Sequence, residues 1–137
     1  MDNSVKSLAN YRLSKSESDL KAAKILFENN LYSQSINRSY YSIFHSVRSL
    51  LSFDKFDSKK HSGIISYFNE HYIKTGLIEK NFSVILMSAE RIRTESDYDD
   101  LFAASKEQAE KQIQNAALFL ERTTSFINAK LGTSTLF

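Results

Sequence analysis

The sequence predicts an all-α protein, an up-and-down antiparallel bundle of about five helices. The 137 residues include no proline and only three glycines, so few positions would interrupt a helix. Apolar residues make up 42% of the chain and recur at helical spacings, and no segment shows the sustained alternation of a strand. The length is that of one domain. We therefore expect a single helical domain over residues 1–137, with its core at about 15–131 and a loose tail at 132–137.

The first two helices are predicted at residues 16–29 and 33–53. Ser14 and Glu17 have the spacing of a capping box, which would start the first helix near Ser16. The second helix carries one wide apolar stripe, at about 100° per residue, as is typical of a helix at the centre of a bundle. The residues of this stripe are Ile36, Tyr40, Ile43, Phe44, Val47, Leu50 and Leu51.

Three further helices are predicted, over residues 59–72, 79–95 and 105–131. Ser58 is expected to cap the third of the five, and the polar segment 94–100 is predicted to be a turn. Ser105 and Gln108 again have capping-box spacing at the start of the fifth, and Gly132 is expected to end it. Helices joined by such short loops pack as antiparallel neighbours.

The composition excludes several classes of protein. Without cysteine there is no disulfide, thiol nucleophile or cysteine-ligated metal, and three glycines cannot build a phosphate-binding glycine loop. A net charge of +2 is not that of a protein that coats DNA. No apolar run approaches the ~20 residues of a membrane span, and the first residues do not resemble a signal peptide. We expect a soluble, cytoplasmic protein with no cofactor and no metal.

Arg38 and His45 are candidate functional residues of the second helix. They are seven residues apart, so they lie about 20° apart on one face, nearly opposite the apolar stripe. That face meets solvent, another helix or a second subunit, and Tyr41 and Arg48 flank the pair. It is either a solvated polar face or a site for an anion or RNA phosphate, since imidazole moves protons and guanidinium holds phosphate. Small hydroxyl residues beside it would let a partner backbone approach closely: Ser35, Ser42 and Ser49.

A second candidate cluster lies at the predicted start of the third helix. Lys59, Lys60 and His61 could meet a phosphate there, where free backbone N–H groups add to the attraction. The alternative is an ordinary basic surface at the beginning of a helix.

A third candidate cluster is rich in acidic residues. Arg93 and Asp97 have the i, i+4 spacing of a local ion pair at a helix end. The carboxylates of residues 97–100 lack the spacing of a calcium-binding loop, so we predict no metal site there.

Segments 37–45, 59–68 and 93–99, with Lys74–Leu77 between the last two, resemble the HEPN domain family (higher eukaryotes and prokaryotes nucleotide-binding). The resemblance covers about residues 15–125, and its nearest branch is the small stand-alone prokaryotic proteins. It implies a helical bundle that is often a homodimer. Many HEPN proteins are metal-independent RNases with an arginine and a histidine separated by four to six residues. Others are the toxin or partner half of a pair with a minimal nucleotidyltransferase.

In this resemblance Arg38 and His45, with six residues between them, match the outer limit of the arginine–histidine motif. His45 would then move a proton to or from the ribose 2′-hydroxyl or the leaving oxygen, and Arg38 would stabilise the charge on phosphorus. The ring of Tyr41 would stack on a base. The full set of expected binding residues is Tyr41, Arg48, Lys59, Lys60, His61, Arg93, Asp97 and Tyr98.

Three functions remain open at the level of sequence. In the first case, the protein binds RNA or a nucleotide and cleaves RNA as one half of a toxin–antitoxin type pair. Alternatively, it is a non-catalytic binding module for a nucleotidyltransferase partner protein. In the third case it is a structural bundle whose polar face is simply solvated.

Overall fold

The computed structural model describes residues 3–132, and every regular element in that range is helical. The helices are α1 (Asn3–Glu28), α2 (Tyr32–Ser52), α3 (His61–Phe68), the π-helix η1 (Asn69–Ile73), α4 (Lys80–Tyr98) and α5 (Lys106–Leu131). The predicted all-α class and the number of major helices are confirmed. The predicted tail at 133–137 lies outside the described residues.

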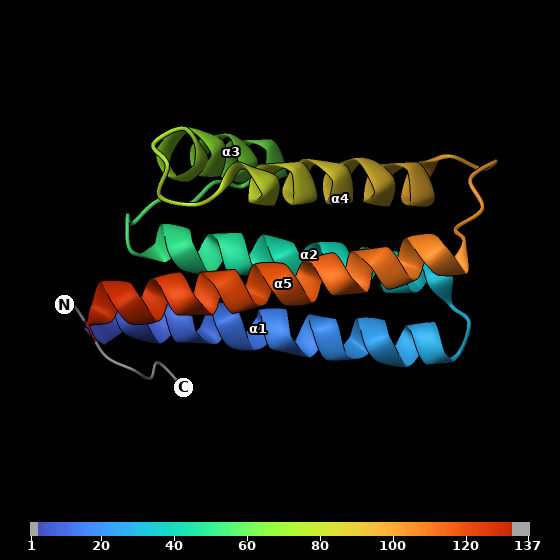
Figure 1. The fold of residues 1–137 in the computed structure, drawn as a ribbon, viewed down its shortest axis with the longest axis horizontal. Coiled ribbons are helices and arrows are strands. Elements are labelled where there is room, and N and C mark those ends of the chain that lie inside the picture. The colour runs from blue at the N-terminus through green and yellow to red at the C-terminus, as the bar shows by residue number, and fades with distance from the viewer. Residues whose placement is uncertain (1–2, 133–137) are drawn as a thin grey trace.

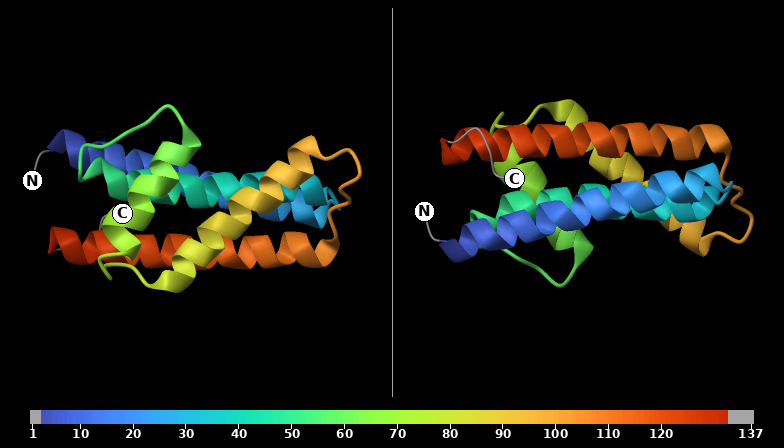
Figure 2. Two further views of the ribbon diagram at one scale, coloured as in Figure 1. Left: turned by 90° about the horizontal axis from the view of Figure 1, so that it is seen from above. Right: turned by 90° about the horizontal axis from the view of Figure 1, so that it is seen from below.

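The helices form two layers (Figure 1). The long helices α1, α2 and α5 lie side by side, and α3, η1 and α4 form the second layer on the other side of α2. Seen from above, α3 and α4 cross the long helices diagonally (Figure 2). Successive long helices α1, α2, α4 and α5 alternate in direction, as expected for an up-and-down bundle. Helix α2 is the central one, because it packs against α1, α3, α4 and α5.

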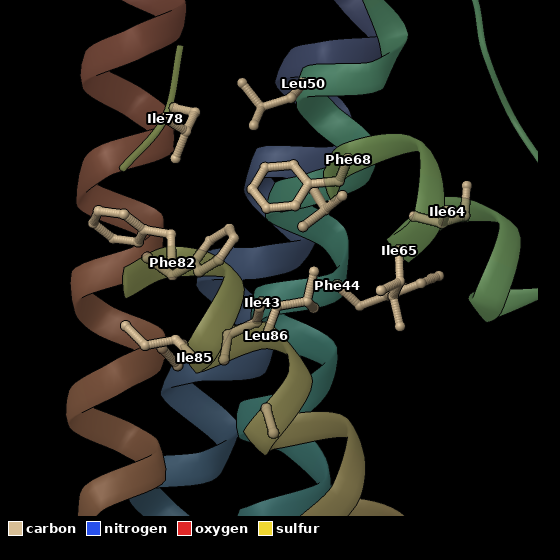
Figure 3. Close-up of a cluster of buried hydrophobic side chains, with 14 of the residues drawn as sticks. Ile43, Phe44, Leu50, Ile64, Ile65, Phe68, Ile78, Phe82, Ile85 and Leu86 are labelled. Atoms are coloured by element: carbon tan, nitrogen blue, oxygen red, sulfur yellow. The ribbon is translucent and has the colours of Figure 1, made fainter. Parts of the chain in front are cut away.

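The core lies between the two layers. Side chains of α2, α3 and α4 converge there with Ile78 from the preceding loop (Figure 3). All residues of the predicted α2 stripe are buried, as expected. The burial of this stripe holds the opposite face of α2, which carries Arg38 and His45, toward α1.

A seam of buried hydroxyl groups joins α1 to α2. Ser16 Oγ donates to the carbonyl of Ser42 at 2.7 Å, and Ser42 Oγ donates back to the carbonyl of Ser16 at 2.9 Å. Farther along, Ser49 Oγ donates to the carbonyl of Ala9 at 2.8 Å. These bonds satisfy buried polar groups and fix how far α1 is shifted along α2. The predicted close approach to a backbone is therefore an approach to α1.

The start of the first helix was predicted wrongly. Helix α1 begins at Asn3, and Ser14 lies inside it, where its hydroxyl donates to the carbonyl of Tyr11. The residues before the predicted start are helical because Ala9 and Leu13 are fully buried in the bundle. Tertiary packing therefore overrides the apparent capping box.

The third and fourth helices also differ in their ends. Helix α3 begins at His61, so Ser58 is not its cap, although Ser58 Oγ accepts the N–H of Lys60 at 3.2 Å. The last part of the predicted third helix is the π-helix η1, which the helical periodicity did not predict. Helix α4 continues to Tyr98, so it includes residues 94–98 of the predicted turn. Carboxylates at i, i+4 from arginines stabilise that last stretch instead of ending it.

The fifth helix follows the prediction. Ser105 and Gln108 form the capping box, each side chain bonding to the other residue's backbone N–H. Gly132 ends the helix with a left-handed φ of 66°, a conformation that glycine adopts without strain.

Candidate functional site

Asp19 of α1 joins the two residues of the predicted motif. Arg38 Nη1 lies 3.0 Å from Asp19 Oδ1, and His45 Nε2 lies 3.6 Å from Asp19 Oδ2. The motif face of α2 is therefore turned toward another helix of the same chain. Asp19 was not predicted, because the sequence does not tell which face of α1 opposes α2. The hydroxyl seam at Ser16, one turn before Asp19, sets this pairing.

Burial determines the charge of these groups. His45 is only 12% exposed in its side chain, and burial lowers its pKa to about 4, helped by the nearby positive charges of Lys15, Arg48, Arg38 and Arg12. His45 is thus neutral at pH 7, and its contact with Asp19 is not an ion pair. Burial raises the pKa of Asp19, while Arg38 opposes this rise. His45 Nδ1 is buried without a hydrogen-bond partner among the described residues.

Tyr41 lies at the centre of the candidate site. The guanidinium groups of Arg38 and Arg93 lie 4.9 Å and 5.9 Å from its ring centroid. The imidazole centroids of His45 and His61 lie 6.1 Å and 5.7 Å from it. Arginines over a ring face are held there by cation–π attraction. We call these five residues the Tyr41 cluster, and the sequence predicted every one of them as a site residue.

Tyr40 and Phe44 were predicted only as core, and they also position His61. The hydroxyl of Tyr40 lies 2.9 Å from His61 Nδ1, and the His61 ring stacks on Phe44 at 4.1 Å. Tyr40 is completely buried. Burial and the nearby carboxylate of Glu90 raise the pKa of Tyr40, and burial lowers the pKa of His61. The α2 stripe therefore serves both the core and the site.

An open hollow of about 650 Å³ adjoins the Tyr41 cluster. Its lining residues are Phe44, Arg48, Asp57, Ser58, Lys59 and His61. Arg48 Nη2 lies 2.9 Å from Asp57 Oδ2, and Arg12 Nη2 lies 3.3 Å from the same oxygen. Because one carboxylate meets two guanidinium groups and Lys59 stands nearby, positive charge exceeds negative charge here. The sequence had marked Arg48 and Lys59 but not Asp57.

The predicted ion pair of α4 is present and leads back to Arg38. Arg93 Nη1 lies 3.6 Å from Asp97 Oδ2, and Asn37 Nδ2 donates to that oxygen at 3.4 Å. Asn37 Oδ1 in turn accepts from Arg38 Nη2 at 2.8 Å. Asp97 thus belongs to the network around Arg38, and Asn37 is a link that the sequence analysis missed.

Two predicted binding residues lie apart from the others. Lys60 is exposed, and Tyr98 is 76% exposed at the end of α4. In the part of the chain that the structure describes, neither side chain makes a hydrogen bond, ion pair or ring contact with the Tyr41 cluster. Over residues 3–132 the histidines and carboxylates form no group of three or more that could hold a metal ion. No helix in this range has the length and apolar character needed to cross a bilayer.

The sequence profile of the HEPN domain matches residues 9–126. This chain belongs to the HEPN domain family. It is 39% identical over 106 residues to a protein of Methanocaldococcus jannaschii that is named as a proposed toxin. The aligned region covers 77% of this chain and 78% of that protein. The chain is 33% identical over 116 residues to a UPF0332 protein of Gloeobacter violaceus. This second alignment covers 84% of the chain and 92% of that protein. The crystal structure of an archaeal HEPN homologue matches 85% of the chain with a TM-score of 0.68 at 18% identity, covering 95% of that homologue.

The HEPN match spans the parts of the chain that build the site. Asp19, the Tyr41 cluster and the hollow all lie between residues 9 and 126. Chemically, the arrangement offers cations for a phosphate, an aromatic ring for a base, and two imidazoles that are neutral near pH 7.

Proposed function

We propose that this HEPN protein binds RNA at the Tyr41 cluster and cleaves it without a metal, as the toxin of a toxin–antitoxin type pair. The observation that carries the proposal is the Tyr41 cluster itself. Arg38, Arg93, His45 and His61 surround one ring beside an open, positively charged hollow. A purely structural polar face has no need of two imidazoles and two guanidinium groups around one aromatic ring.

In this reaction Arg38 exchanges Asp19 for a phosphate oxygen of RNA. A guanidinium binds phosphate in two parallel hydrogen bonds and stabilises the charge that builds up on phosphorus. The exchange leaves the carboxylate of Asp19 beside His45 Nε2 without its arginine. The freed carboxylate and the bound phosphate both favour the imidazolium form of His45. His45 can then give a proton to the leaving 5′-oxygen as a general acid.

The names of two similar proteins of Methanocaldococcus jannaschii support the toxin part of the proposal. A toxin of this kind needs an antitoxin, and a minimal nucleotidyltransferase is the partner that we propose. We also propose that the protein acts as a homodimer in the cytoplasm. The mass of the protein in solution tests the dimer.

A second function is favoured by the burial of His45. A histidine with a pKa of about 4, closed in by Asp19, suits a protein that binds RNA or nucleotide without cutting it. In that case the chain is the binding module of the nucleotidyltransferase partner.

The test is cleavage of a mixed RNA pool in EDTA by the wild type, Arg38→Ala, His45→Ala and His45→Gln. Two variants serve as controls: His71→Ala removes an exposed histidine, and Arg91→Ala removes an arginine whose side chain is 63% exposed. We expect the wild type and both controls to cleave. The Arg38 and His45 variants should be slower by about 100-fold or more, the usual effect of losing acid–base or charge stabilisation.

The outcomes separate the two functions. Full activity of folded His45→Ala or Arg38→Ala contradicts the mechanism. RNA binding without cleavage by the wild type favours the binding module, and absence of both contradicts each function. Circular dichroism and the thermal midpoint show whether each variant is folded.

A further inference from the structure

The proposed reaction needs a base for the 2′-hydroxyl, and the surroundings of His45 suit the acid role. His61 has different surroundings. Its Nδ1 is held by Tyr40 at 2.9 Å, its ring rests on Phe44, and it lines the hollow with Arg48 and Lys59. In the described part of the chain, Nε2 of His61 makes no hydrogen bond. A partly exposed imidazole that lines the hollow therefore has one nitrogen fixed by Tyr40 and the other without a hydrogen bond.

The hydrogen bond to Tyr40 and the charges beside Tyr40 favour one of the two nitrogens of His61 as the carrier of the proton. The hydroxyl of Tyr40 has one proton and lies 2.9 Å from His61 Nδ1. Glu90 raises the pKa of Tyr40, and Arg93, whose guanidinium lies 4.6 Å from the Tyr40 ring centroid, lowers it. A carboxylate can only accept and a guanidinium can only donate. The negative charge of Glu90 therefore favours the orientation in which the Tyr40 proton points toward Glu90, and in that orientation the Tyr40 oxygen accepts from His61 Nδ1–H. This leaves Nε2 of the neutral imidazole with a free lone pair.

We propose that His61 is the general base of the RNA cleavage, with its Nε2 lone pair directed into the hollow by the Glu90–Tyr40 chain. This inference rests on the proposed function. Tyr40 and Glu90 are positioning residues, because they act through His61. Arg48 and Lys59 line the hollow beside His61. In this reaction they contact neighbouring phosphates of the RNA, while Arg38 stabilises the phosphate that reacts.

Nε2 of His61 takes the proton of the ribose 2′-hydroxyl, and the 2′-oxygen forms a bond to phosphorus. The bond from phosphorus to the 5′-oxygen breaks, and that oxygen takes a proton from the imidazolium of His45. The products are an RNA end with a 2′,3′-cyclic phosphate and a second RNA with a free 5′-hydroxyl. No oxidant, reductant or metal takes part.

The charged groups around His61 come from three elements. Helix α2 contributes Arg48, the loop before α3 contributes Asp57 and Lys59, and α4 contributes Glu90 and Arg93. Burial lowers the pKa of His61, Arg93 and Arg48 lower it further, and Glu90 opposes this shift. Because the pKa of His61 is lowered, the imidazole is neutral at pH 7 and able to take a proton.

The first measurement uses the free protein and does not depend on activity. The ¹⁵N chemical shifts of the His61 side chain at pH 7 distinguish an imidazole protonated at Nδ1 from one protonated at Nε2. We expect Nδ1–H in the wild type and loss of this preference in Tyr40→Phe. Tyr72→Phe is the matched control, since Tyr72 is also buried with a hydrogen-bonded hydroxyl. Protonation at Nε2 in the wild type would overturn the inference.

The second measurement is the RNA cleavage rate from pH 4.5 to 8 for the wild type, His61→Gln, His61→Ala and Tyr40→Phe, with His71→Gln as control. We expect His61→Gln to be slower by about 100-fold, with RNA affinity within about twofold, and to lose the acidic limb of the pH profile. Tyr40→Phe should be slower by about tenfold, with that limb displaced.

The results distinguish this inference from the proposed function. A folded His61→Gln that cleaves within threefold of an active wild type overturns the inference and leaves the proposed function standing. A wild type that cleaves no RNA overturns both. Equal losses of cleavage and RNA binding in His61→Gln would make His61 a binding residue only, and would also overturn the inference.

Discussion

His45 and His61 are both imidazoles beside Tyr41, yet their surroundings give them different chemistry. His45 is packed between α1 and α2 with Asp19 at 3.6 Å, and burial keeps it neutral. His61 has one nitrogen fixed by Tyr40 and lines an open hollow. Two titratable groups in different environments can share the acid and base roles of one reaction.

The buried neutral His45 should make the stability of the fold depend on pH. Its pKa of about 4 in the folded chain lies below its ordinary value of 6.5, so the unfolded chain takes up the proton first. The stabilising effect is complete above pH 6.5 and is lost as the pH falls from 6.5 to 4. Between pH 7.5 and 5 the free energy of unfolding should fall by about 2 kcal/mol from this group alone. His61, whose pKa is also lowered, changes stability in the same direction.

Urea unfolding at pH 7.5, 6 and 5 measures this effect. His45→Gln should show a smaller fall than the wild type, by about 2 kcal/mol, because it removes the titrating group. His71→Gln, which replaces an exposed histidine, should follow the wild type. Identical pH dependence in the wild type and His45→Gln would show that His45 is not held neutral by burial.

The sequence analysis identified the site residues of α2 but not the acidic residues that other segments bring to them. The seven-residue spacing put Arg38 and His45 on one face, and that pairing needs only the geometry of a single helix. Asp19 and Asp57 belong to other segments, and they reach the site only through helix packing and loop closure. No local sequence pattern predicts that these two carboxylates lie close to Arg38 and Arg48.

Among the elements, the central helix was the most predictable. The apolar stripe of α2 is buried as expected, because a wide stripe must be covered on more than one side. The start of α1 was mispredicted since Ser14 and Glu17 imitate a cap, while the true helix continues to Asn3 through packing on α2. The π-helix η1 has no counterpart in the 3.6-residue periodicity on which the prediction rested.

Gly63 lies in α3, two residues after His61, and close to Ser58, which lines the hollow. An alanine in the interior of a helix is ordinarily more stable than a glycine by about 1 kcal/mol. Here a Cβ atom would lie 2.5 Å from Ser58 Oγ and 3.0 Å from Ser58 Cβ. Ser58 also accepts the N–H of Lys60, so it cannot move away freely. We expect Gly63→Ala to destabilise the fold by about 1 kcal/mol.

A double-mutant cycle isolates the clash. In a Ser58→Gly background, the side chain that meets the new methyl group is gone. Gly63→Ala should then be neutral or stabilising by up to about 1 kcal/mol in urea unfolding. The same loss in both backgrounds would mean that Ser58 is not the cause.

For the whole molecule, charge is the property that limits RNA binding. The net charge is only +2, so attraction to RNA must come from a local concentration of cations. The Tyr41 cluster and the hollow provide these cations, since Arg38 lies over the Tyr41 ring and Arg48 and Lys59 line the adjoining hollow. The sequence indicated the cations but not the hollow, because the hollow depends on how the loop before α3 folds back over α2.

This arrangement predicts a modest salt dependence of RNA binding that is set by a few residues. Each phosphate contact on single-stranded RNA contributes about −0.7 to the slope of log affinity against log salt concentration. Contacts from Arg38, Arg48 and Lys59 would therefore give a slope of about −2. Arg48→Ala should make the slope shallower by about 0.7 and weaken binding most at low salt. Arg91→Ala, which removes an exposed arginine that pairs with Glu95, should leave the slope unchanged. Fluorescence anisotropy of a labelled RNA at 50, 100 and 200 mM salt measures both variants against the wild type, and equal slopes for Arg48→Ala and Arg91→Ala would place the RNA elsewhere on the surface.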